Sequence, residues 1–152
     1  MKTNIEQIGT YLDRSVKLQI VNSLTTLEID DLSHAVVLVW LAPQSFNSNL
    51  LEIIIKQLIA QNVLSIVVAG ESPNESFSIL LLTLSTIHTI KHIMTGVIES
   101  TCTNDIIEQF LVATWPDENR FDYWTEYRLI VIGNSDLGNH VKIKLISSFI
   151  DR

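Results

Sequence analysis

Short apolar runs alternate with amphipathic segments through the middle of this 152-residue chain. Residues 34–41 and 63–69 are continuous apolar runs rich in β-branched side chains, a pattern typical of strands buried on both faces of a sheet. Two shorter runs, residues 91–95 and 127–133, predict two further strands. Pro43 follows the first run and stops it, so the predicted strands are short.

Between these runs, apolar residues recur at the three- and four-residue spacing of helices that bury one face. They predict helices over residues 47–62, 75–87 and 104–114. An asparagine at position 47 or 49 can cap the first of these helices. Pro116 prevents the third helix from continuing.

The N-terminal segment, residues 1–33, predicts an amphipathic helix followed by an extended piece. Ile5, Ile8 and Leu12 would form the buried face of that helix, because they lie three and four residues apart. The extended piece covers residues 16–21.

The C-terminal segment allows two interpretations. Residues 141–145 alternate between apolar and polar side chains as a strand would, yet four apolar residues recur at helical spacing after Asp136. These four are Leu137, Val141, Leu145 and Phe149. We favour the helix, because alternating strands and helices leave a sheet face that a last helix would cover.

This alternation predicts one α/β domain over residues 1–152. Its expected architecture is a three-layer α/β/α sandwich with a mainly parallel central sheet, Rossmann-like, with the N-terminal helix and extended segment added. The loops that follow strands then meet at one edge of the sheet, where open α/β folds usually bind ligands. These loops are residues 42–48, 70–75, 96–104 and 133–136. Loops that follow helices meet at the opposite edge.

Composition indicates a soluble cytoplasmic protein. The longest apolar runs are far shorter than the roughly 20 residues of a membrane span, so we expect no membrane association. The N-terminus lacks an apolar signal-peptide core. Cys102 is the single cysteine, which excludes an internal disulfide.

Negative charge is concentrated in one part of the chain. Residues 28–126 contain 13 carboxylates and three cations, a net charge of −10, whereas the whole chain carries −7. An acidic surface repels nucleic acid and attracts basic proteins. We therefore expect no direct binding of nucleic acid and a basic protein as the partner.

The charge peaks in residues 115–127, which we call the acidic–aromatic loop. Four acids and five aromatic residues share these 13 positions, and aromatic residues are the anchors that protein interfaces favour. Asp117–Glu126 follows a helix and residues 28–31 precede a strand, so we expect both at the edge opposite the usual ligand site. The candidate partner-binding residues are Glu28, Asp30, Asp31, Asp117, Glu118, Asp122, Tyr123, Trp124 and Glu126.

The alternative is that the aromatic residues pack inward and fasten the loop to the core. For Tyr123 and Trp124 the sequence leaves both possibilities open. Trp115 and Tyr127 stand at the ends of predicted elements, where we expect core packing.

No catalytic or cofactor motif competes with this interpretation. Residues 133–138 have the glycine spacing of a phosphate loop, but Asn139 and His140 stand where that loop needs Lys and Ser or Thr. His88 and His92 are four apart, yet no nearby carboxylate or cysteine completes a metal site. We predict no catalytic residue, no cofactor and no metal, and thus a protein that is not an enzyme.

A small, acidic α/β chain with such a loop resembles the immunity proteins of bacterial toxin–immunity pairs, in particular those of contact-dependent growth inhibition. The residues that suggest it are 92–95, 105–111 and the acidic–aromatic loop. The resemblance implies a non-enzymatic inhibitor that binds one cognate toxin domain, often a basic nuclease, and blocks its active site or substrate surface. No residue's role carries over by motif.

Two other classes of function remain open. One is a small-molecule-binding or enzymatic domain that uses the loops at the carboxyl ends of the strands. Its candidate residues are Glu71, Ser72, Thr95, Thr101 and Cys102. The other is an assembly subunit that forms a homodimer through the acidic–aromatic loop or a sheet edge.

Overall fold

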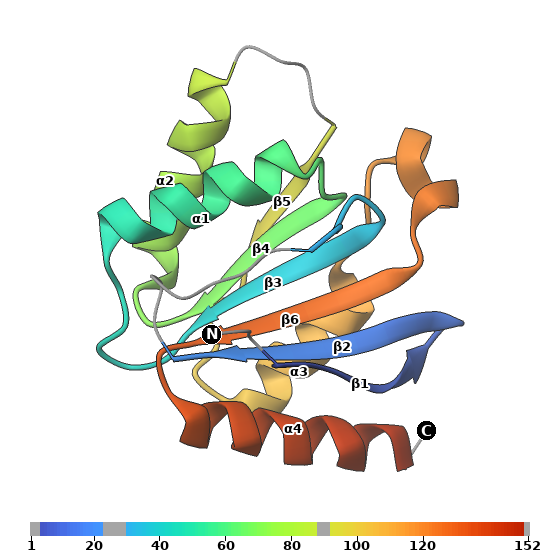
Figure 1. The fold of residues 1–152 in the computed structure, drawn as a ribbon. Coiled ribbons are helices and arrows are strands. Elements are labelled where there is room, and N and C mark those ends of the chain that lie inside the picture. Colours follow the sequence, from blue (N-terminus) through green and yellow to red (C-terminus); the bar gives the residue numbers. More distant parts are fainter. Residues whose placement is uncertain (1–3, 23–29, 88–91, 151–152) are drawn as a thin grey trace.

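The computed structural model describes residues 4–22, 30–87 and 92–150 (Figure 1). Six strands form one sheet in the order β1-β2-β6-β3-β4-β5. β1 is antiparallel to β2, and every other neighbouring pair is parallel. The strands are β1 (Asn4–Tyr11), β2 (Arg14–Val21), β3 (Ala35–Leu41), β4 (Ser65–Gly70), β5 (Met94–Val97) and β6 (Glu126–Ile132). The predicted α/β class with a mainly parallel sheet is therefore confirmed.

The four α-helices lie close to the segments that the sequence predicts, whereas a 3-10 helix forms within the predicted acidic–aromatic loop. They are α1 (Ser48–Ala60), α2 (Pro73–Thr86), α3 (Thr103–Ala113), α4 (Ser135–Ile150) and a 3-10 helix, η2 (Glu118–Tyr123). Asn47 caps α1, because its side-chain oxygen accepts a hydrogen bond of 3.1 Å from the Leu50 amide. The helical interpretation of the C-terminal segment is confirmed by α4. None of the described helices is long and apolar enough to cross a membrane.

Helices pack on both faces of the sheet (Figure 1). β3 is buried along its whole length, and its side chains alternate between two apolar clusters. Val37 and Val39 pack with the buried residues of α1, whereas Val36 and Leu38 pack with those of α3 and α4. The continuous apolar runs of the sequence are explained by this burial on two sides.

The predicted N-terminal helix is wrong, because residues 4–11 form strand β1. The three-residue spacing of Ile5 and Ile8 imitates a helix, but the pairing of β1 with β2 shifts between Gln7 and Gly9. Leu12 and Asp13 form the hairpin turn with positive φ angles of 50° and 65°. Hairpins prefer such turns, but Asn and Gly usually form them, so the sequence gives no hairpin signal here.

The loops that follow the strands meet at one edge, as predicted. The Glu71 carboxylate, after β4, accepts hydrogen bonds from the amides of Gln44 at 2.7 Å and Phe46 at 2.9 Å, after β3. These bonds hold the pKa of Glu71 below its usual value and leave its carboxylate with a structural role.

Candidate protein-binding surface

The acidic–aromatic loop runs from the end of α3 to the start of β6, at the edge of the sheet where the parallel strands begin (Figure 1). Residues 30–34 lie beside it. The Thr125 amide donates a 3.0 Å hydrogen bond to the carbonyl of His34, and Asp30 contacts Arg128 in β6. The loop and Asp30 therefore share one edge, as the sequence predicts. Glu28 lies outside the described residues.

The aromatic side chains of the loop divide into two groups. Tyr123 is 68% exposed and Phe121 is also exposed, whereas Trp124 is 7% exposed and Tyr127 is fully buried. Burial raises the pKa of Tyr127 to about 12. The core position predicted for Tyr127 is thus confirmed. Trp124 fastens the loop to the core and is removed from the candidate contact residues, while Tyr123 faces outward.

Trp115 is 54% exposed, so its predicted core position is wrong. Its backbone is fixed, because its carbonyl accepts a 3.0 Å hydrogen bond from the Ser65 hydroxyl. α3 ends at Ala113, two residues earlier, so the indole is not part of the helix face that packs on the sheet.

Arg14 holds one end of η2. Its guanidinium carbon lies 3.8 Å from the centre of the Trp124 ring and 5.2 Å from that of Phe121. Its Nε also donates a 3.1 Å hydrogen bond to the Trp124 carbonyl. The β1–β2 hairpin is thereby attached to η2, which places the exposed Leu12 at the same end of the molecule.

Arg120 holds the loop from the other side. Its guanidinium donates hydrogen bonds to the backbone carbonyls of Asn62, Val63 and His92. Burial lowers the pKa of Arg120, and the nearby negative charge of Asp117 opposes this shift. The loop's own arginine is thus bonded to carbonyl groups rather than to the acids around it.

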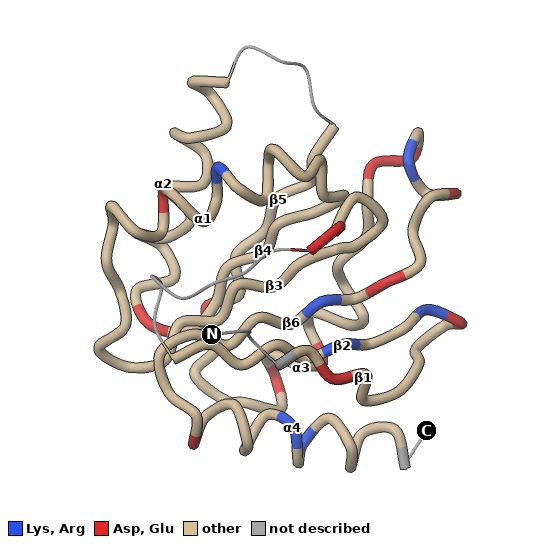
Figure 2. The backbone as a smooth tube through the Cα atoms, viewed as in Figure 1, with Lys and Arg blue, Asp and Glu red and all other residues tan. Residues whose placement is uncertain are grey.

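The acids of η2 and its cap form no ion pair with any residue the structure describes. These acids are Asp117, Glu118 and Asp122. The Asp117 side chain accepts a 2.9 Å hydrogen bond from the Asn119 amide and thereby caps η2. Figure 2 shows these acids gathered on the loop that projects from the sheet. No described cation therefore neutralises their charge through an ion pair.

Glu126 does not belong to this surface, because it is 2% exposed. Its two oxygens lie 3.2 Å from Lys17 Nζ and 2.7 Å from Arg128 Nε. A buried carboxylate needs such partners, so the role of Glu126 is to form ion pairs inside this edge of the sheet. We correct its assignment from partner contact to structural ion pair.

Asp30 and Asp31 are exposed but engaged with the chain itself. Burial raises the pKa of Asp30, but the hydrogen bonds and positive charge of Arg128 outweigh it, so the pKa lies below its usual value. Hydrogen bonds from the Ser33 amide and hydroxyl lower the pKa of Asp31. Both carboxylates therefore stay ionised at neutral pH and add to the negative edge.

The opposite edge carries a hollow of about 300 Å³, where the alternative function placed its site. Glu71 and Thr101 line it, together with apolar residues that include Trp40 and Leu137. Ser72 and Cys102 are not among its lining residues, and Thr95 lies within β5, on a different hollow. Two of the five sequence candidates are thus brought together there.

Sequence reasoning missed the residues that hold the surface in place. Arg14 and Arg120 are far apart in sequence from most of the groups they bind, and no local pattern marks them. The sequence pattern around Leu12 and Phe121 did not predict that these apolar side chains would be exposed. One available signal was that Arg120 is the only cation within the acidic–aromatic loop.

In the part of the chain that the structure describes, no group of three or more His, Cys, Asp or Glu side chains could hold a metal ion. His88 lies outside that part. Comparison with protein-family models, with curated proteins and with solved structures gave no match.

Proposed function

We propose that this chain is an immunity protein, which binds a cognate, basic toxin domain in the cytoplasm and blocks its active site or substrate-binding surface without catalysing a reaction. One observation carries the proposal. Phe121 and Tyr123 are exposed on a loop that two arginines hold in place, among three carboxylates without a described ion-pair partner.

This arrangement has the physical properties of a protein-binding site. Exposed aromatic side chains supply most of the binding energy in many interfaces. A loop already fixed before binding loses little conformational entropy on association. Unpaired carboxylates accelerate encounter with a cationic partner and compete for a groove that would otherwise hold nucleic acid.

The proposed contact surface differs from the sequence prediction in the residues that leave it and those that join it. Trp124 and Glu126 leave it because they are buried, and Glu28 is left out because it lies outside the described residues. Leu12, Asp13 and Phe121 join it, since Arg14 brings the β1–β2 turn next to η2. The surface then consists of Leu12, Asp13, Asp31, Asp117, Glu118, Phe121, Asp122 and Tyr123, with Asp30 at its margin.

We further infer that the fold is the three-layer α/β/α arrangement. Its support is that α1 packs in one apolar cluster of the sheet and α3 and α4 pack in the other. Such layering covers both faces of the sheet, so a partner can reach the sheet only at its two ends and its outer strands.

The proposal predicts that a gene next to that of this chain encodes a large exported protein with a basic C-terminal domain. That domain is expressed in bacteria with and without this chain, and growth is followed. We expect growth to stop with the domain alone and to recover when this chain is co-expressed. If growth does not recover, or the two purified proteins do not associate, the proposal is wrong.

Charge reversal then locates the surface. The variant Asp117→Lys, Glu118→Lys, Asp122→Lys should slow association at least tenfold at low salt and flatten the dependence of the rate on salt. A matched variant, Glu52→Lys, Glu75→Lys, Asp136→Lys, changes net charge equally on α1, α2 and α4 and should have a much smaller effect. Equal effects would place the contact elsewhere.

A second candidate function is small-molecule binding at the carboxyl edge, favoured by the hollow of about 300 Å³ there. Its size suits a small ligand. However, Glu71 already bonds two backbone amides, and the Ser100 hydroxyl lies 3.4 Å from an Asp105 carboxylate oxygen. Few free polar groups remain to select a ligand. A screen for metabolites that raise the melting temperature, repeated with Thr101→Leu, would test this function.

A further inference from the structure

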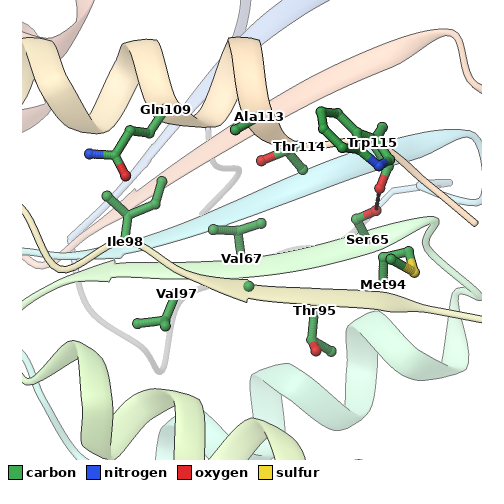
Figure 3. A pocket seen from close by; sticks show the side chains of 11 residues that line it. Ser65, Val67, Met94, Thr95, Val97, Ile98, Gln109, Ala113, Thr114 and Trp115 are labelled. Carbon is green, nitrogen blue, oxygen red and sulfur yellow. Dashed lines mark hydrogen bonds between the residues drawn. The ribbon is translucent and has the colours of Figure 1, made fainter.

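A second feature at the side of the sheet lies close to the proposed surface. A hollow of about 260 Å³ lies between β5, the strand at one side of the sheet, and helix α3. Figure 3 shows the side chains that line it. Val67 and Gly96 form its floor, and Gln109, Ala113 and Trp115 line the opposite side. A Cβ atom at Gly96 would lie 3.5 Å from Val67, an ordinary contact. Because Gly96 has no side chain, the space above it can hold a side chain from another molecule.

The outer edge of β5 has unused backbone groups. The amides of Met94 and Ile98 donate to Leu64 and Val68 in or beside β4. Because backbone groups alternate in direction along a strand, those of Thr95 and Val97 point away from β4. Among the described strands, β5 is the outer strand on its side of the sheet, so no described strand pairs with these groups. Such an edge accepts an added strand.

The surroundings of the hollow are acidic. A neighbouring hollow shares Gln109 and Ala113 with it and adds the carboxylates of Asp105 and Glu108. Asp117 and Glu118 stand two and three residues after Trp115 along the chain. No described lysine or arginine lines either hollow. A cationic segment therefore complements this side of the molecule.

We propose that an extended, cationic segment of the partner adds to β5 as a seventh strand and places one apolar side chain in the hollow above Gly96. This inference rests on the proposed function, because the segment belongs to the same basic partner. Backbone bonds to Thr95 and Val97 would hold the strand, and the hollow would select its apolar residue. Lysine or arginine residues beside it would face Asp105 and Glu108.

The first experiment needs no toxin. Random 12-residue peptides displayed on phage are selected on the purified protein, and the best peptide is then synthesised and its affinity measured by fluorescence anisotropy. We expect enrichment of an apolar residue flanked by Lys or Arg. No enrichment of that pattern, or a best peptide that binds the hollow-filling variants below equally well, would overturn the inference.

Two variants fill the hollow from opposite sides. Gly96→Leu fills it from the strand and Ala113→Leu from the helix, and each should weaken the peptide at least tenfold. Asn104→Leu is the matched control, because Asn104 is exposed on α3 and lines neither this hollow nor the neighbouring one. It should change affinity less than twofold. Since Ala113→Leu leaves β5 intact, loss of binding cannot be blamed on damage to the strand.

Peptides methylated at alternate backbone nitrogens test strand pairing. One of the two alternate sets should lose at least tenfold in affinity and the other should not, since only one set faces β5. Equal affinity of both sets would exclude strand addition.

The same variants separate this inference from the proposed function. With the toxin domain, Gly96→Leu should speed dissociation, whereas charge reversal on η2 should slow association. If this chain protects growth but the toxin dissociates from Gly96→Leu as slowly as from the wild type, the strand inference alone is wrong. Failure of growth protection would overturn the proposed function, whatever the peptides show.

Discussion

Arg128 and Asp30 are joined by two hydrogen bonds across 98 residues of sequence, from Nη1 to Oδ1 at 2.9 Å and from Nη2 to Oδ2 at 3.1 Å. Arg128 is fully buried in β6, whereas the Asp30 side chain is about half exposed. A buried guanidinium requires acceptors, and Asp30, Glu126 and Gln19 supply them. The pair thereby holds the segment before β3 against the start of β6, next to the acidic–aromatic loop.

Replacing Asp30 should destabilise this edge. Asp30→Asn removes the charge that faces Arg128, and we expect a loss of about 1–3 kcal/mol in the free energy of unfolding, measured with urea. Asp31→Asn is the control, because Asp31 accepts its described hydrogen bonds from the nearby Ser33. A loss no larger than that of the control would show that Arg128 finds sufficient acceptors without Asp30.

The same pair predicts a dependence of stability on pH. The folded-state pKa of Asp30 is lowered, so its contribution is present above the unfolded value of about 4 and is lost as pH falls through the folded value. Urea unfolding between pH 5 and 2.5 should show stability falling below about pH 4. The slope should be shallower in Asp30→Asn, and an identical slope would contradict the assignment.

Adjacent aromatic residues of the loop should behave oppositely. Trp124→Ala removes a buried ring and should cost about 3 kcal/mol or more. Tyr123→Ala should change stability by less than about 0.5 kcal/mol and instead weaken partner binding, since the ring is exposed. Trp124→Phe should cost less than Trp124→Ala, because the indole nitrogen makes no hydrogen bond to described residues. A destabilised Tyr123→Ala would mean that its ring packs on the core.

Arg120 should control the order of the loop. Arg120→Ala removes the bonds to Asn62, Val63 and His92, so limited proteolysis should cleave residues 117–123 several times faster while the global unfolding midpoint moves little. Asn119→Ala, an exposed neighbour, should leave cleavage unchanged. Equal cleavage of the Arg120 variant and the wild type would show that Arg14 and Trp124 suffice to hold η2.

Two glycines should differ in their tolerance of a methyl group. Gly70 has a φ of 93°, and a Cβ there would overlap the backbone of Leu41, so Gly70→Ala should cost at least about 2 kcal/mol. At Gly96 the added Cβ meets Val67 at an ordinary 3.5 Å, so Gly96→Ala should be nearly neutral. Thermal unfolding of both variants checks this. A strongly destabilised Gly96→Ala would show that the floor of the hollow needs glycine for its backbone.

The pattern of apolar residues determined most of the architecture. β3 and β4 are buried on both faces, so their runs are continuous, and the helices α1 and α3 bury one face, so their apolar residues recur at helical spacing. The order of the strands across the sheet could not be predicted from these patterns. The N-terminal prediction failed because β1 is formed by pairing with β2 through an unusual Leu12–Asp13 turn, and pairing leaves no local trace.

The sequence by itself determined the α/β class, the position of the acidic–aromatic loop and the concentration of its charge, because these depend on local spacing and composition. Only the tertiary structure decided which side chains of that loop are available. Trp124 is drawn inward by Arg14, Glu126 by Lys17 and Arg128, while Tyr123 and Phe121 stay exposed. Neighbours in sequence differ in this way because burial depends on contacts with β2 and β6, which lie over 100 residues apart along the chain.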